Sequence, residues 1–207
     1  MSEQVELTNP IELSVGGLRG HLFRRAIHLG MSFLPLIYFE YGRARASDVG
    51  LSLPQFVSAV VFILFAAESI RLKFGLTIYG QREYEAHQIS ALGWGAFGIG
   101  LVFLLAPTKE YIWPLILSLS LGDPFLGEMR RLGLETRNVI ISSTAFLFLV
   151  WVACWHFVQT PFWLAFLFAP LCVASEWPRL RYIDDNATMV LIPLGMILLL
   201  EPFLGLL

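Results

Sequence analysis

Four acidic side chains in this sequence have the residue types and the spacing of a magnesium site. Asp184 and Asp185 are adjacent and are followed by Asn186. Glu176 lies eight residues before Asp184, and Asp123 stands in a separate Gly-Asp-Pro motif. Mg²⁺ prefers carboxylate oxygens as ligands, and a bound cation relieves the repulsion between adjacent aspartates. The same residues could instead cap helices, because Asp and Asn favour the N-cap position.

A basic cluster, Arg24-Arg25-Ala26-Ile27-His28, offers the complementary charge. Arg24 and His28 are four residues apart, so in a helix they lie on the same face. Arginines at the end of a membrane helix often only extend toward the interface, and an isolated histidine is usually a packing residue. Paired with Arg24 at a helix entrance, His28 could instead help to hold a phosphate.

The Gly122-Asp123-Pro124 motif interrupts the fourth apolar stretch of the sequence. Proline suits the first turn of a helix, and aspartate suits the N-cap before it. We therefore expect the fourth membrane helix to be broken near Gly122–Pro124. The free N–H groups of a helix that starts there would favour an anion, and Asp123 would hold a cation that bridges to that anion.

The composition places these residues in an unusually apolar chain. Hydrophobic residues make up 57% of the 207 positions and charged residues only 14%, against about 25% in average soluble domains. These values exclude a disordered chain, a coiled coil and an ordinary soluble domain, and they indicate a polytopic membrane protein. The net charge of -2 leaves no basic surplus for binding nucleic acid. Cys154 and Cys172 lie in apolar runs and are expected to pack as small hydrophobic residues.

Seven apolar stretches approach the roughly 20 residues that a membrane-spanning helix needs. They cover residues 25–41, 54–70, 89–106, 111–126, 137–157, 161–176 and 187–206. Because the connections are short, we expect an all-α bundle of about seven transmembrane helices, which forms one membrane domain over residues 24–207. Residues 1–23 would form a cytoplasmic or interfacial segment, whose first 20 residues lack the apolar core of a cleavable signal peptide.

Basic residues are unevenly distributed between the two sides of this expected bundle. With seven spans, 11 of the 14 Lys and Arg residues fall on the side of the N-terminus and 3 on the other. The positive-inside rule then places the N-terminus and the charged motifs in the cytoplasm and the C-terminus outside. If the short fourth stretch did not cross, the distribution would be 6 inside and 8 outside, which the rule disfavours. We expect a multi-pass protein of a prokaryotic inner membrane.

The motifs together resemble those of the CTP-dependent polyprenol kinases, a family that includes dolichol kinase, phytol kinase and CTP-dependent diacylglycerol kinases. The similarity runs from Arg24 to about Pro193 and rests on four motifs in order: RRAIH (24–28), REYEAHQISA (82–91), GDP (122–124) and EWPRLRYIDDN (176–186). The chain departs from the family pattern at Arg130, where a glycine is usual. It also departs at Pro193, which follows Asn186 by seven residues where about four is usual.

The resemblance implies Mg²⁺-dependent transfer of the γ-phosphate of CTP to the hydroxyl of a membrane lipid alcohol at the cytoplasmic face. The residues that would hold Mg²⁺ are Asp123, Asp184, Asp185 and, as a fourth acid, Glu176. The residues that would bind the nucleotide and its phosphates are Arg24, Arg25, Arg82, Gly122 and Asn186. The proton of the alcohol would pass to His28 or to one of the aspartates.

Three other functions fit parts of the pattern. A CTP-dependent diacylglycerol kinase would use the same site on a different alcohol. A cytidylyltransferase, similar to CDP-diacylglycerol synthase, would transfer the cytidylyl group to a lipid phosphate and release pyrophosphate. An ion-coupled transporter would need intramembrane acids that form a path. The acids of this chain do not form such a path, which argues against a transporter. Glu68 and Asp123 lie on the predicted inner side, whereas Glu40, Glu110 and Glu201 lie on the outer side.

Overall fold

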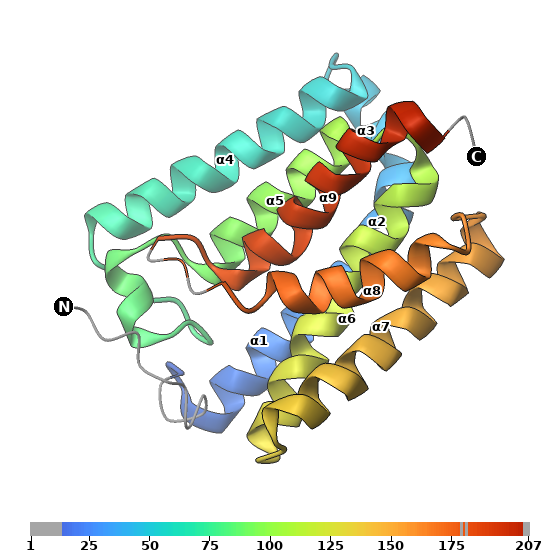
Figure 1. Ribbon diagram of the computed structural model, residues 1–207. Coiled ribbons are helices and arrows are strands. Elements are labelled where there is room, and N and C mark those ends of the chain that lie inside the picture. Colours follow the sequence, from blue (N-terminus) through green and yellow to red (C-terminus); the bar gives the residue numbers. More distant parts are fainter. Residues whose placement is uncertain (1–13, 179, 181, 205–207) are drawn as a thin grey trace.

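The computed structural model describes residues 14–178, 180 and 182–204. Within these residues the regular secondary structure consists of helices and one isolated β-bridge between Ser14 and Arg82, so the predicted all-α class is confirmed. Figure 1 shows the helices packed side by side, with α4 along one edge of the bundle and α7 along the opposite edge. The helices are α1 (Gly17–Met31), α2 (Leu34–Ile37), the π-helical turn η1 (Tyr38–Gly42), α3 (Arg43–Asp48), α4 (Leu53–Lys73), the 3₁₀ turn η2 (Glu83–His87), α5 (Ala91–Leu105), α6 (Lys109–Arg131), α7 (Thr136–Val158), α8 (Leu164–Ser175) and α9 (Asp185–Leu204).

Three helices are long and apolar enough to cross a membrane: Leu53–Lys73, Thr136–Val158 and Asp185–Phe203. At a rise of about 1.5 Å per residue, helices of this length span roughly 30 Å, the thickness of the hydrocarbon core of a bilayer. The helices α5 and α8 are also apolar but have only 15 and 12 residues. The chain thus has the helices of a membrane protein, and the arrangement of seven spans stays a prediction. Residues 1–13 of the expected N-terminal segment lie outside the described residues.

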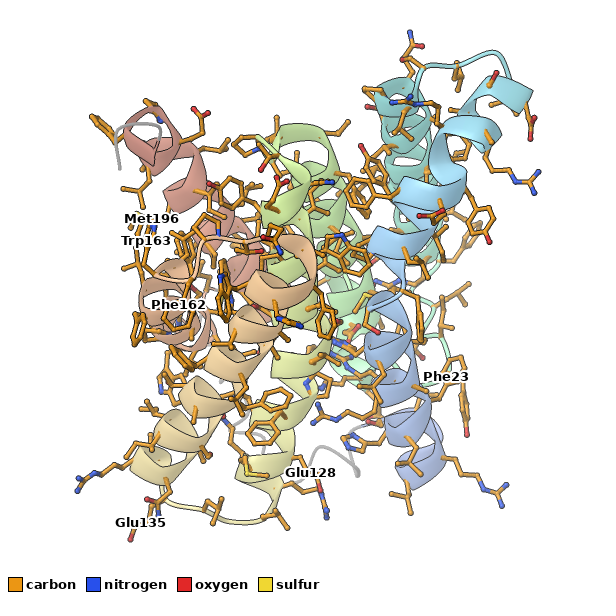
Figure 2. All side chains as sticks on the ribbon, turned by 90° about the vertical axis from the view of Figure 1, so that its right-hand side faces the viewer. Phe23, Glu128, Glu135, Phe162, Trp163 and Met196 are labelled. Atoms are coloured by element: carbon orange, nitrogen blue, oxygen red, sulfur yellow. The ribbon has the colours of Figure 1, made fainter. Side chains whose placement is uncertain are left out.

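Many apolar side chains point away from the bundle. Phe62 on α4 is 77% exposed and Phe157 on α7 is 78% exposed. Such extensive apolar exposure is unusual for a soluble monomer and fits a surface covered by lipid. Figure 2 shows acidic residues such as Glu128 and Glu135 at one end of the bundle, whereas Trp163 lies away from that end.

The helix α6 runs without a break from Lys109 to Arg131, so the prediction of a fourth helix broken near Gly122–Pro124 is wrong. Pro124 removes one backbone hydrogen bond but does not end the helix, because α6 is held between α1, α7 and α9. Gly122 permits close packing here, since a Cβ at this position would lie 3.0 Å from Leu147 Cδ2 on α7. Asp123 is therefore inside a helix, and the helix N-terminus that we expected at this point does not exist.

The first apolar stretch, rather than the fourth, is interrupted. The helix α1 ends at Met31, and the chain makes a turn before α2 and η1 continue. Two residues of the sequence favour this end: Pro35 has no backbone N–H to donate, and the Ser32 hydroxyl donates to the Leu29 carbonyl at 2.6 Å. The expected span over residues 25–41 is thus built from shorter helical pieces.

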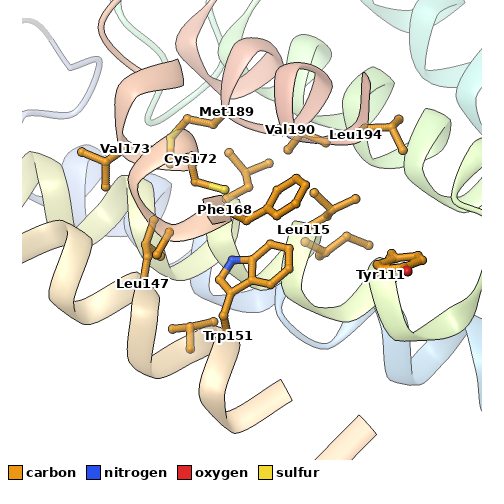
Figure 3. Packing of buried hydrophobic residues seen from close by; sticks show 14 of the residues in the cluster. Tyr111, Leu115, Leu147, Trp151, Phe168, Cys172, Val173, Met189, Val190 and Leu194 are labelled. Atoms are coloured by element: carbon orange, nitrogen blue, oxygen red, sulfur yellow. The ribbon is translucent and has the colours of Figure 1, made fainter. Parts of the chain in front are cut away.

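An apolar core joins α6, α7, α8 and α9. At its centre the rings of Trp151 and Phe168 stack with centroids 4.9 Å apart, as Figure 3 shows from close by. The indole N–H of Trp151 donates to Ser118 Oγ on α6 at 3.0 Å, so the buried indole N–H has a hydrogen-bond partner. This core fixes α6 and α9 relative to each other, and both helices carry candidate functional acids.

A buried arginine ties the loop between α4 and α5 to the end of α4. Arg71 donates from Nε and Nη2 to the Glu68 carboxylate at 2.9 and 2.8 Å. Its remaining N–H groups donate to the backbone carbonyls of Leu76, Glu85 and Gln88 at 2.7 or 2.8 Å. Arg71 is only 4% exposed, and its five donors are all used. The conformation of this loop therefore depends on one side chain.

We expect the substitution Arg71→Met to destabilise the protein by about 3–5 kcal/mol, because it leaves the Glu68 carboxylate buried without its counter-ion. Thermal unfolding in detergent measures the change, and limited proteolysis should show earlier cleavage in the loop between α4 and α5. The matched control is Arg45→Met, since Arg45 pairs with Asp48 on the surface and both side chains are at least 60% exposed. Equal effects of the two substitutions would contradict a role of Arg71 as the organiser of the loop.

Candidate metal and phosphate site

Three carboxylates that are far apart in the sequence converge at one point of the bundle. Asp123 comes from α6, Glu176 directly follows α8, and Asp185 is the first residue of α9. One carboxylate oxygen from each residue lies within 4.8 Å of the others. Three hard oxygen donors at this spacing form a ligand set suited to Mg²⁺ or a similar cation. We refer to Asp123, Glu176 and Asp185 as the acid cluster.

Asp184, the fourth predicted metal ligand, does not belong to this cluster of three. Its Oδ1 accepts a hydrogen bond from the backbone N–H of Asn186 at 3.1 Å, and its carbonyl accepts from Ala187 at 3.0 Å. Both contacts cap the first turn of α9, where N–H groups have no partner within the helix. The adjacent aspartates thus divide the two roles that the sequence suggested: Asp184 caps the helix and Asp185 faces the other acids.

Basic side chains contact two of the three acids. His28 Nδ1 lies 3.2 Å from Asp123 Oδ2. Arg25 Nη1 lies 3.8 Å from the same carboxylate oxygen and donates to the Asp123 carbonyl at 3.2 Å. Arg130 Nη1 donates to Glu176 Oε1 at 2.7 Å. Among the described residues, no basic side chain makes an ion pair with Asp185. Asp185 is therefore the member of the cluster whose charge a bound cation would have to neutralise.

Two buried acceptor atoms at this site have no protein partner. Glu176 is 5% exposed, and its Oε2 accepts no hydrogen bond while Oε1 is bound to Arg130. Asn186, next to Asp185 in the chain, donates from Nδ2 to the Ala91 carbonyl at 3.3 Å but leaves Oδ1 without a partner. The residues present thus fit a bound cation, which would stabilise the ionised carboxylates.

Arg25 reaches Asp123 because α6 has a glycine where a side chain would block it. A Cβ at Gly127 would lie 2.2 Å from Arg25 Nη2, which is closer than any two such atoms can approach. Gly127 is one turn after Asp123, so the guanidinium lies across the surface of α6 beside the carboxylate. A larger residue at position 127 would therefore displace the guanidinium from its place beside the acid cluster.

The remaining predicted phosphate ligands lie in different surroundings. Arg24 donates to Glu85 at 2.7 Å, and Arg82 donates to the Tyr84 hydroxyl at 2.7 Å. Both arginines still interact electrostatically with Asp123. Gly122 packs against α7 in the core, as described above. Of the predicted site residues, the structure therefore brings His28, Arg25 and the acid cluster into one group, with Arg24 and Arg82 beside it.

Two residues of this site were missed from the sequence. Arg130 was noted only as a departure from a family pattern, yet it pairs with Glu176 and its guanidinium lies 4.7 Å from the centre of the Trp177 ring. Glu85 lies in a stretch of mixed charges and pairs with Arg24, which is 61 residues away in the chain. No local spacing signals either pairing, because both join separate helices or loops.

Comparisons of the chain with protein-family models, with curated proteins and with solved structures find no match. What the site can do is therefore inferred from its own residues. Three carboxylates can bind a divalent cation, arginines beside them can bind phosphate oxygens, and an imidazole in contact with a carboxylate can accept a proton.

We expect Asp185→Asn to raise the melting temperature of the metal-free protein and to remove most of its stabilisation by Mg²⁺ or Mn²⁺. The substitution takes one negative charge out of a repulsive cluster and deletes a ligand at the same time. At a metal concentration about 100 times Kd, the wild-type protein should gain roughly 2.7 kcal/mol. Thermal unfolding with and without metal, together with Mn²⁺ binding followed by electron paramagnetic resonance, measures both effects.

The matched control for this experiment is Glu128→Gln. Glu128 is also on α6, but it pairs with Arg131 on the surface and lies outside the acid cluster. Its substitution should leave the metal-dependent stabilisation unchanged. A wild-type response to metal in Asp185→Asn would contradict the assignment of the cluster as a cation site.

Proposed function

We propose that this protein is an integral-membrane lipid kinase that transfers the γ-phosphate of CTP to the hydroxyl of a lipid alcohol, of the polyprenol, phytol or dolichol type, with Mg²⁺. The single observation that carries this proposal is the acid cluster with His28 in contact with Asp123. It combines a cation site, positive charge and a proton acceptor in a chain with membrane-spanning helices. The choice of CTP as the donor follows the resemblance of the four sequence motifs to the polyprenol kinases.

In this proposal Asp123, Glu176 and Asp185 would hold Mg²⁺ together with the triphosphate, and the metal would supply positive charge to the phosphate oxygens. Arg25 and Arg82 add further positive charge, which stabilises the charge that develops on the transferred group. The hydroxyl oxygen of the lipid forms a bond to the γ-phosphorus while the bond from that phosphorus to the bridging oxygen breaks, so CDP leaves. The hydroxyl proton passes to His28, whose Nδ1 lies 3.2 Å from Asp123 Oδ2.

The membrane arrangement in this proposal has the N-terminus and the acid cluster on the cytoplasmic side and the C-terminus outside, with about seven spans in a prokaryotic inner membrane. The distribution of Lys and Arg supports it. Glu128 and Glu135 lie between the predicted spans 111–126 and 137–157, in a loop that this orientation places in the cytoplasm. Figure 2 shows both residues at the same end of the bundle, which is consistent with the orientation. In this orientation a cytoplasmic nucleotide and a membrane alcohol reach the same cluster.

The proposal predicts that purified protein with Mg²⁺ transfers label from γ-labelled CTP to a lipid alcohol from a panel of prenols and diacylglycerol. Asp123→Asn and Asp185→Asn should lose nearly all transfer, because each removes a ligand of the metal that binds the phosphates. Glu128→Gln serves again as the control and should retain activity. Transfer of α-label to a lipid phosphate, with release of pyrophosphate, would instead identify a cytidylyltransferase.

A second prediction separates the proton acceptor from the metal ligands. His28→Gln should lower kcat by about 10²–10⁴-fold, the contribution of a general base, and should leave more residual activity than Asp123→Asn. It should also leave the binding of Mn²⁺ nearly unchanged, because His28 is not a member of the acid cluster. Activity of His28→Gln equal to that of the wild type would exclude a role as base.

A further inference from the structure

A groove lies between α1 and the loop that joins α4 to α5, next to the acid cluster. It has a cavity volume of about 60 Å³ and opens to the outside of the bundle. One wall is formed by Arg24, Ile27, His28 and Met31, which lie at helical spacing on a single face of α1. The groove therefore runs along α1, with polar side chains at Arg24 and His28 and apolar ones at Ile27 and Met31.

The mouth of the groove is apolar and exposed. Phe23 of α1 and Tyr79 of the loop both line the groove, are 46% and 47% exposed, and contact each other with ring centroids 5.7 Å apart. Figure 2 shows Phe23 on the outward side of α1. The loop that carries Tyr79 also exposes Phe74 and Leu76, which lie outside the groove lining and are 66% and 55% exposed. In a membrane protein such a surface faces hydrocarbon, so an apolar chain can enter the groove from the bilayer.

The polar part of the groove lining adjoins the acid cluster through His28. His28 lines the groove and also contacts Asp123, so the imidazole forms the boundary between the two sites. The ion pair between Arg24 and Glu85 lies on the same lining. A molecule with a long apolar chain and one polar end would match this arrangement, with its polar end at His28.

Gln81 carries a buried donor in the groove that has no acceptor. Gln81 is 6% exposed and lines the groove. Its Oε1 accepts from the backbone N–H of Ile78 at 2.8 Å, which fixes the orientation of the amide. The other amide atom, Nε2, is buried and has no hydrogen-bond partner. A buried N–H group without a partner costs free energy, and an oxygen atom of a bound molecule would remove that cost.

We propose that this groove binds the lipid alcohol, with the apolar chain along Ile27 and Met31 and with Gln81 Nε2 donating a hydrogen bond to the hydroxyl oxygen. This inference rests on the proposed kinase function for the identity of the ligand as an alcohol. A hydroxyl oxygen can accept from Gln81 while its own hydrogen is directed to the ring nitrogen of His28. Gln81 is then a positioning residue, which orients the hydroxyl and takes no proton itself.

Photolabelling tests the groove directly and needs neither nucleotide nor metal. Purified protein in nanodiscs is irradiated with a prenol that carries a diazirine on its chain, and labelled peptides are mapped by mass spectrometry. We expect labelling of residues 23–31 and 78–92 that excess unlabelled prenol competes away and excess phosphatidylcholine does not. Competed labelling confined to other helices, such as α4, would overturn the proposal.

Two substitutions test the groove and its donor separately. Ile27→Trp fills the groove and should remove most of the competed labelling, whereas Leu29→Trp, at an exposed position of the same helix, should not. Gln81→Glu keeps the acceptor for the Ile78 N–H but loses the donor, and should weaken prenol binding by roughly 2- to 10-fold. Gln88→Glu is the same substitution on the same loop outside the groove lining and should have no effect.

The comparison of two alcohols tests which oxygen Gln81 contacts. If the contact is to the hydroxyl, Gln81→Glu should weaken the binding of a prenol and of a diacylglycerol by the same factor. Unchanged binding of the prenol would overturn the assignment. Because binding is measured without CTP, a protein that labels in the groove but transfers no phosphate would refute the kinase proposal and leave the groove assignment standing.

Discussion

The convergence of three carboxylates, of which Glu176 is buried and Asp123 and Asp185 are partly buried, is the constraint on which the rest of this site depends. Like charges brought within 4.8 Å of one another repel strongly in surroundings from which water is largely removed. The bundle offsets this repulsion with His28 and Arg25 at Asp123 and with Arg130 at Glu176. Each of these partners comes from a different element than the acid it contacts. The electrostatic repulsion within the cluster is therefore offset by contacts that only the tertiary structure creates.

Pairing of charges between separate elements also holds the loop between α4 and α5 in place beside the acid cluster. Arg71 holds the loop between α4 and α5 through Glu68 and three backbone carbonyls, and Arg24 attaches that loop to α1 through Glu85. The buried Arg71 and the partly buried Arg24 thus stabilise the fold, whereas Arg25 and Arg82 are the arginines that we propose neutralise a bound phosphate. A loop placed this firmly can form one wall of a groove and can hold the Gln81 amide in a fixed orientation.

The apolar surface and the polar cluster meet along α1. This helix is exposed on one side at Phe23 and Leu29, and on its other side places His28 against Asp123. A ligand that must bring a hydroxyl from a bilayer to a charged site needs such a path, because a charged site cannot be moved into hydrocarbon without a large free-energy penalty. The helix α1 ends at Met31, which is also the last residue of α1 that lines the groove and which packs against the apolar core.

The sequence by itself determined the all-α class and the candidate acids, because apolar runs, low charge and residue types are local properties. It did not determine whether Pro124 ends a helix, because that depends on packing against α1, α7 and α9. The sequence suggested that the adjacent aspartates either cap a helix or bind a metal. Only the position at which α9 begins shows that Asp184 caps the helix and that Asp185 joins the acid cluster. The partners Arg130 and Glu85 were decided by tertiary structure alone, since electrostatic pairing acts through space and their partners lie 46 and 61 residues away in the chain.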